Sequence, residues 1–248
     1  MTQMFKYDGK MPQEALDILD AAGATIVSPT KVGYIIMTAD RAGLDVKFQV
    51  KKRPARKPGV VLCSGIEQLK ELAEVNDEIL KLYEKHWEQD ILLGCILPWR
   101  KDAMHLIPDD GSVEMMTDAR ETSCFVIRFG KPSEEIVTHR WNTGKRLTFA
   151  SSANESGKGN MGVFEGIGER ILGGVTMAVE ADDFVKSIQP TKTQETRHEQ
   201  GVMVSMVDDA GKITDTPVLI RAGLDVDKIM ALLSEQYNTW DYRHGSYY

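Results

Sequence analysis

Residues 147–154 read Leu147-Thr148-Phe149-Ala150-Ser151-Ser152-Ala153-Asn154, a strand-like run followed directly by small and polar residues. The first four residues have the composition of a β-strand, and the next four supply hydroxyls, an amide and small side chains where that strand ends. Ligands of α/β proteins bind at such strand ends, because free backbone N–H groups and the ends of following helices point into the crevice there. Taken alone, the segment is more simply interpreted as a polar turn, so the rest of the chain has to decide.

Strand-like and helix-like patterns alternate on both sides of this stretch. The expected helices cover residues 12–22, 64–75, 76–87, 163–173 and 225–236, and the expected strands cover 24–28, 59–63, 91–98, 124–129, 146–150, 175–179, 202–207 and 218–220. Ser64 and Glu67 have the spacing of a capping box for the second helix. The last helix has acidic residues in its first turn and is expected to bury Ile229, Leu232 and Leu233. Because strands outnumber helices, the pattern predicts a mixed sheet.

Two long polar segments, 186–200 and 108–123, are expected to be loops. Loops of this length in a compact domain often act as lids or interaction segments. The chain has no internal repeat, no low-complexity tract and no change of composition that would indicate a linker. We therefore expect residues 1–248 to form a single domain.

Composition limits the classes of protein that need to be considered. A length of 248 residues is enough to bury a sizeable core, and a net charge of −7 argues against a surface used entirely for nucleic-acid binding. Cys63, Cys95 and Cys124 are widely spaced among apolar residues, which favours reduced core thiols over disulfides or a zinc site. There is no signal-peptide pattern and no apolar run long enough to span a bilayer, so we expect a cytoplasmic protein without a membrane role.

The highest local charge density lies in residues 47–57. It contains Lys47, Lys51, Lys52, Arg53, Arg56 and Lys57, and it is interrupted by Pro54 and followed by Pro58. Six positive charges this close repel one another unless solvent or an anion screens them. The prolines fix the backbone so that the cluster is not one smooth helical face. An anionic ligand would relieve the repulsion, and the alternative is a solvated basic loop.

Other motifs are excluded. Gly157-Lys158-Gly159 lacks the spacing of a P-loop, and Gly166-x-Gly168 lacks the third glycine of a dinucleotide fingerprint. The five histidines have no metal-ligand spacing, and Asp109-Asp110 is more simply a polar turn, so no metal site is predicted from side-chain spacing.

The basic segment and the segment after residue 150 together resemble the YrdC/Sua5/YciO family. Lys51 and Arg53 with Lys57-Pro58 match its Lys-x-Arg-Pro…Lys-Pro motif, and Ser152 and Asn154 match the polar positions of its Ser-x-Ala-Asn-x-Ser-Gly motif. Weaker matches follow in the same order as in the family, over roughly residues 12–233, and leave residues 234–248 as an aromatic C-terminal tail. These weaker matches are Pro29-Thr30 with Tyr34, Ile127-Arg128, Ser205 to Asp208, and Ile220-Arg221-Ala222-Gly223.

Several positions depart from the family pattern. Lys31 replaces an acidic residue, Phe129-Gly130 replaces a residue followed by proline, Ala222 replaces a proline, and His86-Trp87-Glu88-Gln89-Asp90 replaces Trp-Pro-Gly-Pro. Gly33-Tyr34 is closer to the YciO branch. The phosphate-side motifs are thus kept, whereas positions on the acceptor-substrate side differ.

The resemblance implies a twisted mixed α/β sheet with helices around a concave, basic nucleotide-binding surface. It implies ATP as a substrate, with Mg²⁺, and formation of a threonylcarbamoyl-adenylate from threonine and bicarbonate for tRNA modification. Fixed cations would stabilise the charge that develops on the phosphoryl oxygens. By resemblance, Lys51 and Arg53 are catalytic and bind the nucleotide with Ser152, Asn154 and Arg221, whereas Thr30, Tyr34, Arg128 and Ser205 bind the amino acid, Arg128 through its carboxylate.

Two alternatives remain open. The first is a YciO-like or biosynthetic paralogue that uses the same adenylate chemistry on another carbamoyl substrate or small amine. The second is a non-catalytic module that binds double-stranded RNA through phosphate contacts. The aromatic tail, from Trp240 to Tyr248, is expected to dock either on this domain or on a second subunit of a homodimer.

Overall fold

The computed structural model describes residues 1–52, 59–155 and 158–243. Its strands are β1 (Gln3–Lys6), β2 (Thr25–Thr30), β3 (Gly33–Thr38), β4 (Val60–Leu62), β5 (Leu93–Pro98), β6 (Thr122–Ile127), β7 (Phe149–Ser152), β8 (Met177–Glu180), β9 (Val202–Val207), β10 (Ile213–Arg221) and β11 (Asp241–Tyr242). Its α-helices are α1 (Gln13–Asp17), α2 (Arg41–Lys51), α3 (Ile66–Leu72), α4 (Asp77–Glu88), α5 (Val113–Met116), α6 (Lys131–Gly144), α7 (Glu169–Gly174), α8 (Asp182–Ile188) and α9 (Val226–Gln236). Short 3₁₀ turns are η1 (Ile18–Asp20), η2 (Lys101–Leu106) and η3 (Glu165–Ile167).

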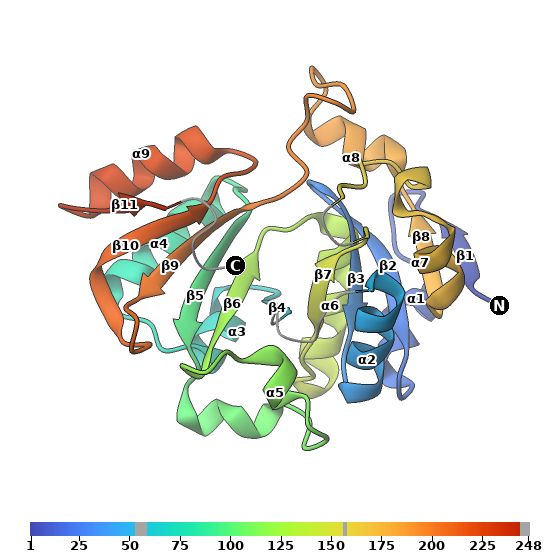
Figure 1. The fold of residues 1–248 in the computed structure, drawn as a ribbon, viewed down its shortest axis with the longest axis horizontal. Coiled ribbons are helices and arrows are strands. Elements are labelled where there is room, and N and C mark those ends of the chain that lie inside the picture. The colour runs from blue at the N-terminus through green and yellow to red at the C-terminus, as the bar shows by residue number, and fades with distance from the viewer. Residues whose placement is uncertain (53–58, 156–157, 244–248) are drawn as a thin grey trace.

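The strands form one twisted, eleven-stranded sheet in the order β1-β8-β2-β3-β7-β4-β6-β5-β9-β10-β11 (Figure 1). Parallel pairs such as β4/β6 and β5/β9 alternate with antiparallel pairs such as β2/β3 and β5/β6. The prediction of a mixed α/β sheet is therefore confirmed. Strands from both ends of the chain join this sheet, and its central strands β7, β4 and β6 lie between one half made of β1, β8, β2 and β3 and another made of β5, β9, β10 and β11.

The hairpin between β2 and β3 turns through Thr30-Lys31-Val32-Gly33. The Thr30 hydroxyl donates to the Gly33 carbonyl at 2.9 Å and accepts the Val32 N–H at 3.3 Å. Gly33 has φ +122°, a conformation that side-chain-bearing residues rarely adopt. The sequence therefore fixes a tight turn that brings Thr30 and Tyr34 next to the middle of the sheet.

The apolar core contains the three cysteines. Cys63, Cys95 and Cys124 are free thiols and are fully buried, as the sequence predicted. Burial raises the pKa of the Cys124 thiol to about 12, and it raises the other two further, so all three remain protonated. Their role is packing: Cys63 and Cys95 lie in the cluster that includes residues of α3 and α4, and Cys124 lies in a second cluster with Ile96, Met203 and Ile220.

The longest helix, α6, was not predicted. Its apolar face is narrow, because buried Ile136, Val137 and Trp141 alternate with polar residues, and Pro132 stands at its N-terminus where proline is well tolerated. A buried charge completes the packing. Arg140, with a 4% exposed side chain, contacts Asp20 at 2.5 Å.

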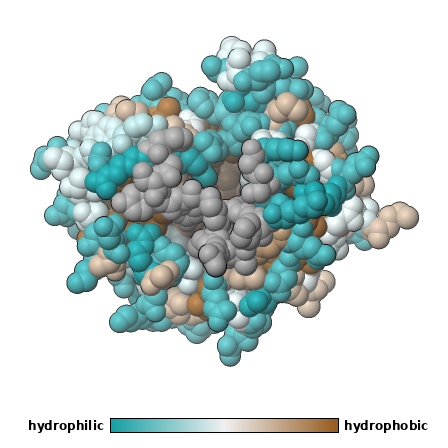
Figure 2. Space-filling model, in the orientation of Figure 1, coloured by the Kyte–Doolittle hydropathy of each residue, from teal (hydrophilic) through white to brown (hydrophobic). Residues whose placement is uncertain are grey.

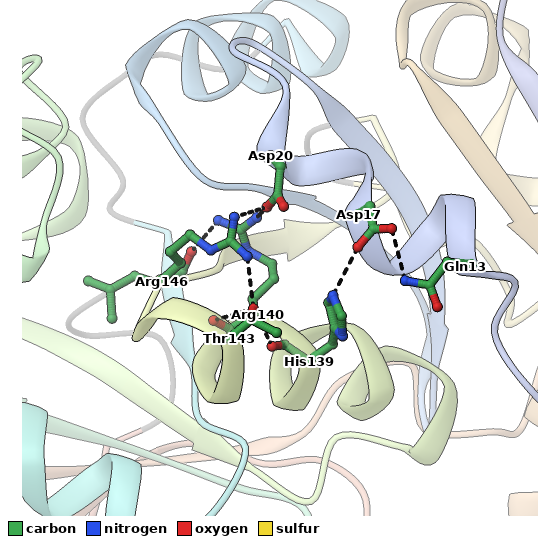
Figure 3. Close-up of polar contacts among 8 residues, drawn as sticks. Gln13, Asp17, Asp20, His139, Arg140, Thr143 and Arg146 are labelled. Carbon is green, nitrogen blue, oxygen red and sulfur yellow. Dashed lines mark hydrogen bonds and ion pairs between the residues drawn. The ribbon is translucent and has the colours of Figure 1, made fainter.

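Figure 3 shows how this contact joins α6 to the chain segment before β2. Arg146 shares the Asp20 carboxylate at 2.6 Å, and His139 contacts Asp17 at 2.9 Å. Periodicity of apolar residues alone does not reveal a helix that is held in part by such polar contacts. The elements β3 and α2, which follow β2 along the chain, were also not predicted.

The capping box proposed for α3 is wrong. The residue before this helix is Gly65, without a side-chain cap. The Ser64 N–H and hydroxyl are both directed to the side-chain oxygen of Gln68, at 2.6 and 2.8 Å. By contrast, Asn76 caps α4 as a helix start should, by accepting the N–H of Ile79 at 2.8 Å. The last helix buries Ile229, Leu232 and Leu233 as predicted.

The two expected loops contain some regular structure. Residues 108–123 include α5 and the first residues of β6, and residues 186–200 begin with the end of α8. Within the described part of the C-terminal tail, β11 pairs with β10, and the Trp240 indole donates to Ser234 at 3.0 Å, so this part docks on the same chain. None of the helices in the described ranges is both long and apolar enough to cross a membrane.

Candidate functional site

A cavity of about 680 Å³ lies over the middle of the sheet. It is bordered by β3, β4, β6 and β7, by the start of β9 and the end of β10, and by the loop that precedes β9. Figure 2 shows a small opening near the middle of this face, with hydrophilic residues above it and farther to the right. Its polar lining among the described residues is Thr30, Tyr34, Ser151, Ser152, Asn154, Lys158, Asn160, Arg197, His198, Glu199, Gln200 and Arg221.

The two strongest sequence motifs meet at this cavity. Lys51 is the last residue of α2, is only 2% exposed, and directs its ammonium to the Ser152 carbonyl and, at 3.2 Å, to the Ser152 hydroxyl. The two residues are 101 positions apart in the chain. Ser152 is the last residue of β7, opposite Ile35 of β3. The chain therefore places an ammonium and a hydroxyl together at a strand end.

Asn154 shapes the turn after β7. Its side-chain amide donates to the carbonyls of Glu155, at 2.8 Å, and Lys158. The Glu155 carboxylate pairs with Lys158 at 3.0 Å and with Arg170 at 2.7 Å, and these contacts lower its pKa. Arg53, the second charged residue of the basic motif, lies outside the described residues.

The basic segment is not a solvated loop where it is described. Lys47 and Lys51 belong to α2 and are 1% and 2% exposed. The Lys47 ammonium lies 4.4 Å from the centre of the Phe48 ring. Burying two lysine side chains beside the cavity is unusual, because lysine is almost never fully buried without a partner. This burial separates them from Lys52, which is exposed.

Three more predicted residues line the cavity. Arg221 ends β10, and its Nε donates to the Gly201 carbonyl at 2.9 Å. Thr30 lies in the β2–β3 hairpin. The Tyr34 hydroxyl donates to Asp182 at 2.5 Å and accepts the Ala181 N–H at 2.9 Å. Burial, and then this contact with Asp182, raises the pKa of Tyr34, so the phenol stays neutral and holds β3 to α8.

Arg128 and Ser205 do not line the cavity that the described residues form. Arg128 donates twice to the Trp87 carbonyl, at 2.7 and 2.9 Å, and its guanidinium lies 3.7 Å from the centre of the Trp87 ring. Ser205 lines a separate cavity of about 240 Å³ and donates to the Val207 carbonyl at 3.1 Å. The structure thus brings five predicted residues together at one cavity: Thr30, Tyr34, Ser152, Asn154 and Arg221. Lys51 contacts Ser152 of this set, whereas Arg128 and Ser205 lie elsewhere.

The polar residues Asn160, Arg197, Glu199 and Gln200 of the cavity were not singled out from the sequence. Asn160 is 5% exposed, and its amide donates to the Tyr34 carbonyl at 3.1 Å. Arg197 and Glu199 belong to the loop before β9. A single polar residue in a polar loop gives no sequence signal, and only the path of the loop across the sheet places these residues at the cavity.

The sheet, the cavity and the meeting of the two motifs define a YrdC-like α/β protein. The Sua5_yciO_yrdC family model, described as "Telomere recombination", matches residues 19–191. This is more than half of the chain, which therefore belongs to the Sua5/YciO/YrdC family. The weaker matches around Ser205 and Arg221 lie beyond the matched range. None of the curated proteins compared with the chain matches it.

Solved structures agree with this family. A hypothetical protein from Streptococcus mutans is 52% identical over 100% of both chains, with a TM-score of 0.94. Sua5 of P. abyssi, in complex with L-threonine, has a TM-score of 0.65 and 21% identity over 98% of this chain and 62% of its own. E. coli YciO has a TM-score of 0.63 and 18% identity over 90% of this chain and 97% of its own. At these lower identities the likeness concerns the fold.

Proposed function

We propose that this protein is an ATP-dependent carbamoyl-adenylate synthase that joins a carbamoylated amine to AMP and releases pyrophosphate. The observation that carries the proposal is the contact of the buried Lys51 ammonium with Ser152 at the wall of the cavity. Membership of the Sua5/YciO/YrdC family and the fold shared with a threonine-bound Sua5 support it. L-threonylcarbamoyl-AMP, made from threonine, bicarbonate and ATP for tRNA modification, is the leading product.

The chemistry suits the residue types at the cavity. A carbamate oxygen attacks the α-phosphorus of ATP. The bond between this phosphorus and the oxygen that bridges it to the β-phosphorus breaks, and pyrophosphate leaves with that oxygen. Negative charge grows on the phosphoryl oxygens, and Lys51, Arg53, Ser152, Asn154 and Arg221 would stabilise it by charge and hydrogen bonds. Mg²⁺ would enter with the nucleotide as part of the substrate.

A second candidate uses the same adenylate chemistry on another carbamoyl substrate. It is favoured by the position of Arg128, which contacts Trp87 instead of lining the cavity. Incubation with ATP, bicarbonate and each amino acid or small amine in turn, followed by measurement of released pyrophosphate, separates the two. Turnover with threonine supports the first candidate. Turnover with another amine alone keeps the chemistry and rejects threonine as the substrate.

The nucleotide assignment is tested by Arg53→Ala. We expect ATP affinity to fall by at least about 100-fold, because a bidentate contact to phosphate would be lost. Arg100→Ala is the matched control, since Arg100 is exposed, pairs with Asp102 at 2.6 Å and does not line the cavity. Unchanged ATP affinity in Arg53→Ala means that the site is wrongly assigned. Absence of ATP binding in the wild type, together with salt-sensitive affinity for double-stranded RNA, supports the RNA-binding module instead.

A further inference from the structure

The loop before β9 crosses the cavity. It leaves α8 beside one half of the sheet and enters β9 in the other half (Figure 1). Residues 191–196 are exposed, whereas Arg197 and Glu199 are partly buried and line the cavity. Gln189, which is 6% exposed, fixes the return of the loop, because its side chain donates to the His198 carbonyl at 2.9 Å and accepts the His198 N–H at 2.8 Å. Arg197 and Glu199 are the chain neighbours of His198, whose backbone Gln189 holds in place.

Arg197 is held in place, and among the residues that the structure describes no carboxylate lies within ion-pair distance of it, although the charges of Glu199 and Asp182 act on it from farther away. Its Nη2 donates to the Val185 carbonyl at 3.1 Å, and its Nε is buried with no hydrogen-bond partner in the described part of the chain. The guanidinium packs on Gly162, where a Cβ would lie 2.3 Å from its central carbon. Burial lowers the pKa of Arg197, and the charge of Glu199 opposes that shift.

Glu199 is in a similar situation. One carboxylate oxygen, Oε1, is buried and lacks a partner among residues 1–52, 59–155 and 158–243. The other, Oε2, lies over Gly159, where a Cβ would be only 1.7 Å away. Within the same residues no ion pair inside 4.0 Å joins Glu199 to Arg197, although the charge of Glu199 acts on Arg197 at longer range. Two opposite charges thus face one cavity without pairing.

A partly buried charge without a close counter-ion loses hydration that no partner replaces, so a ligand that pairs with both Arg197 and Glu199 would be bound strongly. We propose that the loop supplies the amino-acid recognition pair of this site, with Arg197 binding the α-carboxylate and Glu199 binding the α-ammonium group of a zwitterionic amino acid. This inference rests on the proposed function, because it names residues that select its acceptor substrate. It assigns to Arg197 the role that the family resemblance implies for Arg128, whose guanidinium contacts Trp87.

The test is calorimetric titration of the full chain with each of the twenty protein amino acids, without bicarbonate, in the presence and absence of ATP. The best ligand is then compared with the amine that lacks its carboxylate and the acid that lacks its amino group. Arg197→Ala should weaken amino-acid binding by about 10- to 100-fold and leave binding of the carboxylate-free amine unchanged. Glu199→Gln should weaken amino-acid binding and leave binding of the amine-free acid unchanged.

Gly159→Ala provides an independent variant. The new methyl group would displace the Glu199 carboxylate, which is the end of a flexible side chain, so the protein should fold normally and behave as Glu199→Gln does. Lys192→Ala and Glu195→Gln, in the exposed part of the same loop, are matched controls and should bind as the wild type does.

Two results would overturn the proposal. One is that no amino acid binds under either condition. The other is that Arg128→Ala, rather than Arg197→Ala, removes the preference for the carboxylate. Failure of ATP binding alone would reject the proposed synthase activity, whereas the titration without nucleotide would still test the recognition pair.

Discussion

The two sides of the cavity differ in how closely their residues match the family pattern and in what those residues contact. On the α2–β7 side, the residues that match the family are in contact, because Lys51 reaches Ser152 across 101 positions of sequence. On the side formed by the β2–β3 hairpin and the end of β6, the residues that depart from the family contact one another. Lys31 is 6% exposed and pairs with Asp90 at 2.7 Å. On the first side Ser152 and Asn154 line the cavity, whereas on the other side Lys31 and Arg128 contact Asp90 and Trp87 instead of lining it.

The backbone explains part of this difference. Arg128 has φ +54°, so the chain leaves the extended conformation directly after β6 and the arginine turns toward Trp87. Gly130 has φ +127°, which the proline of the family pattern, fixed near −65°, cannot adopt. A Cβ on Gly130 would lie 3.0 Å from the backbone nitrogen of Lys31. Glycine here permits the hairpin and the end of β6 to approach closely.

The departures therefore form one structural unit. The charges of Lys31, Arg128 and Asp90 all act on Glu134, which lies in the first turn of α6. Burial raises the pKa of Glu134, and the nearby Lys31 and Arg128 oppose the rise. Separate mismatches in a sequence pattern can thus represent a single rearrangement, and here it concerns the side where the acceptor substrate would bind.

The largest effect is expected on the α2–β7 side. Lys51→Ala removes a buried cation that contacts Ser152 of the cavity lining, and we expect ATP affinity to fall by roughly 1,000-fold, or about 4 kcal/mol. Titration of ATP into the variant measures the loss. Lys52→Ala, which changes the exposed neighbour, is the control and should bind ATP nearly as the wild type does. Equal losses in both variants would show that general basicity, and not the Lys51–Ser152 contact, binds the nucleotide.

The next largest effect is a pH dependence of stability, which originates from His86 in the segment 86–90 that departs from the family pattern. His86 is fully buried in the last turn of α4, with Nδ1 2.7 Å from the Leu82 carbonyl, and burial lowers its pKa to about 4. The unfolded chain, with an ordinary pKa near 6.5, therefore takes up a proton first as the pH falls. Stability from this group is present above about pH 6.5 and is lost toward pH 4, by about 3 kcal/mol in total.

Urea unfolding at several pH values between 4.5 and 7.5 checks this expectation. As the pH falls through this window, the free energy of unfolding should decrease less in His86→Leu than in the wild type, because the contribution of His86 is absent. His105→Leu changes an exposed histidine and serves as the control. If His86→Leu shows the same slope as the wild type, another group causes the loss.

The sequence predicted the central strands and the nucleotide side because their signals are local. The apolar run 202–207 forms strand β9 as predicted, and at the cavity Ser152 ends β7 and Asn154 follows it. Helix α6 was missed because buried Arg140 interrupts its apolar face and is stabilised by Asp20, 120 positions away. The position of Arg128 was also not predictable, since it depends on a left-handed backbone conformation that the residue type does not signal.

The smallest expected effect tests whether the departures act as a unit. A double-mutant cycle with Lys31→Met and Asp90→Asn should give a coupling energy of about 1 kcal/mol in urea unfolding, because Lys31 is buried but the Asp90 side chain is 66% exposed and partly screened by water. Asparagine tolerates the positive φ of Asp90, so the backbone is kept.

A matching cycle on the exposed pair Lys70 and Glu67, which are 3.1 Å apart, should give only about 0.3 kcal/mol. ATP affinity should change by less than about twofold in all of these variants, because neither pair contacts the α2–β7 side. A coupling energy for Lys31 and Asp90 no larger than that of the exposed pair would mean that the two departures are independent. A large change in ATP affinity would mean instead that the two sides of the cavity are not separable, and the distinction between a retained nucleotide side and an altered acceptor side would fail.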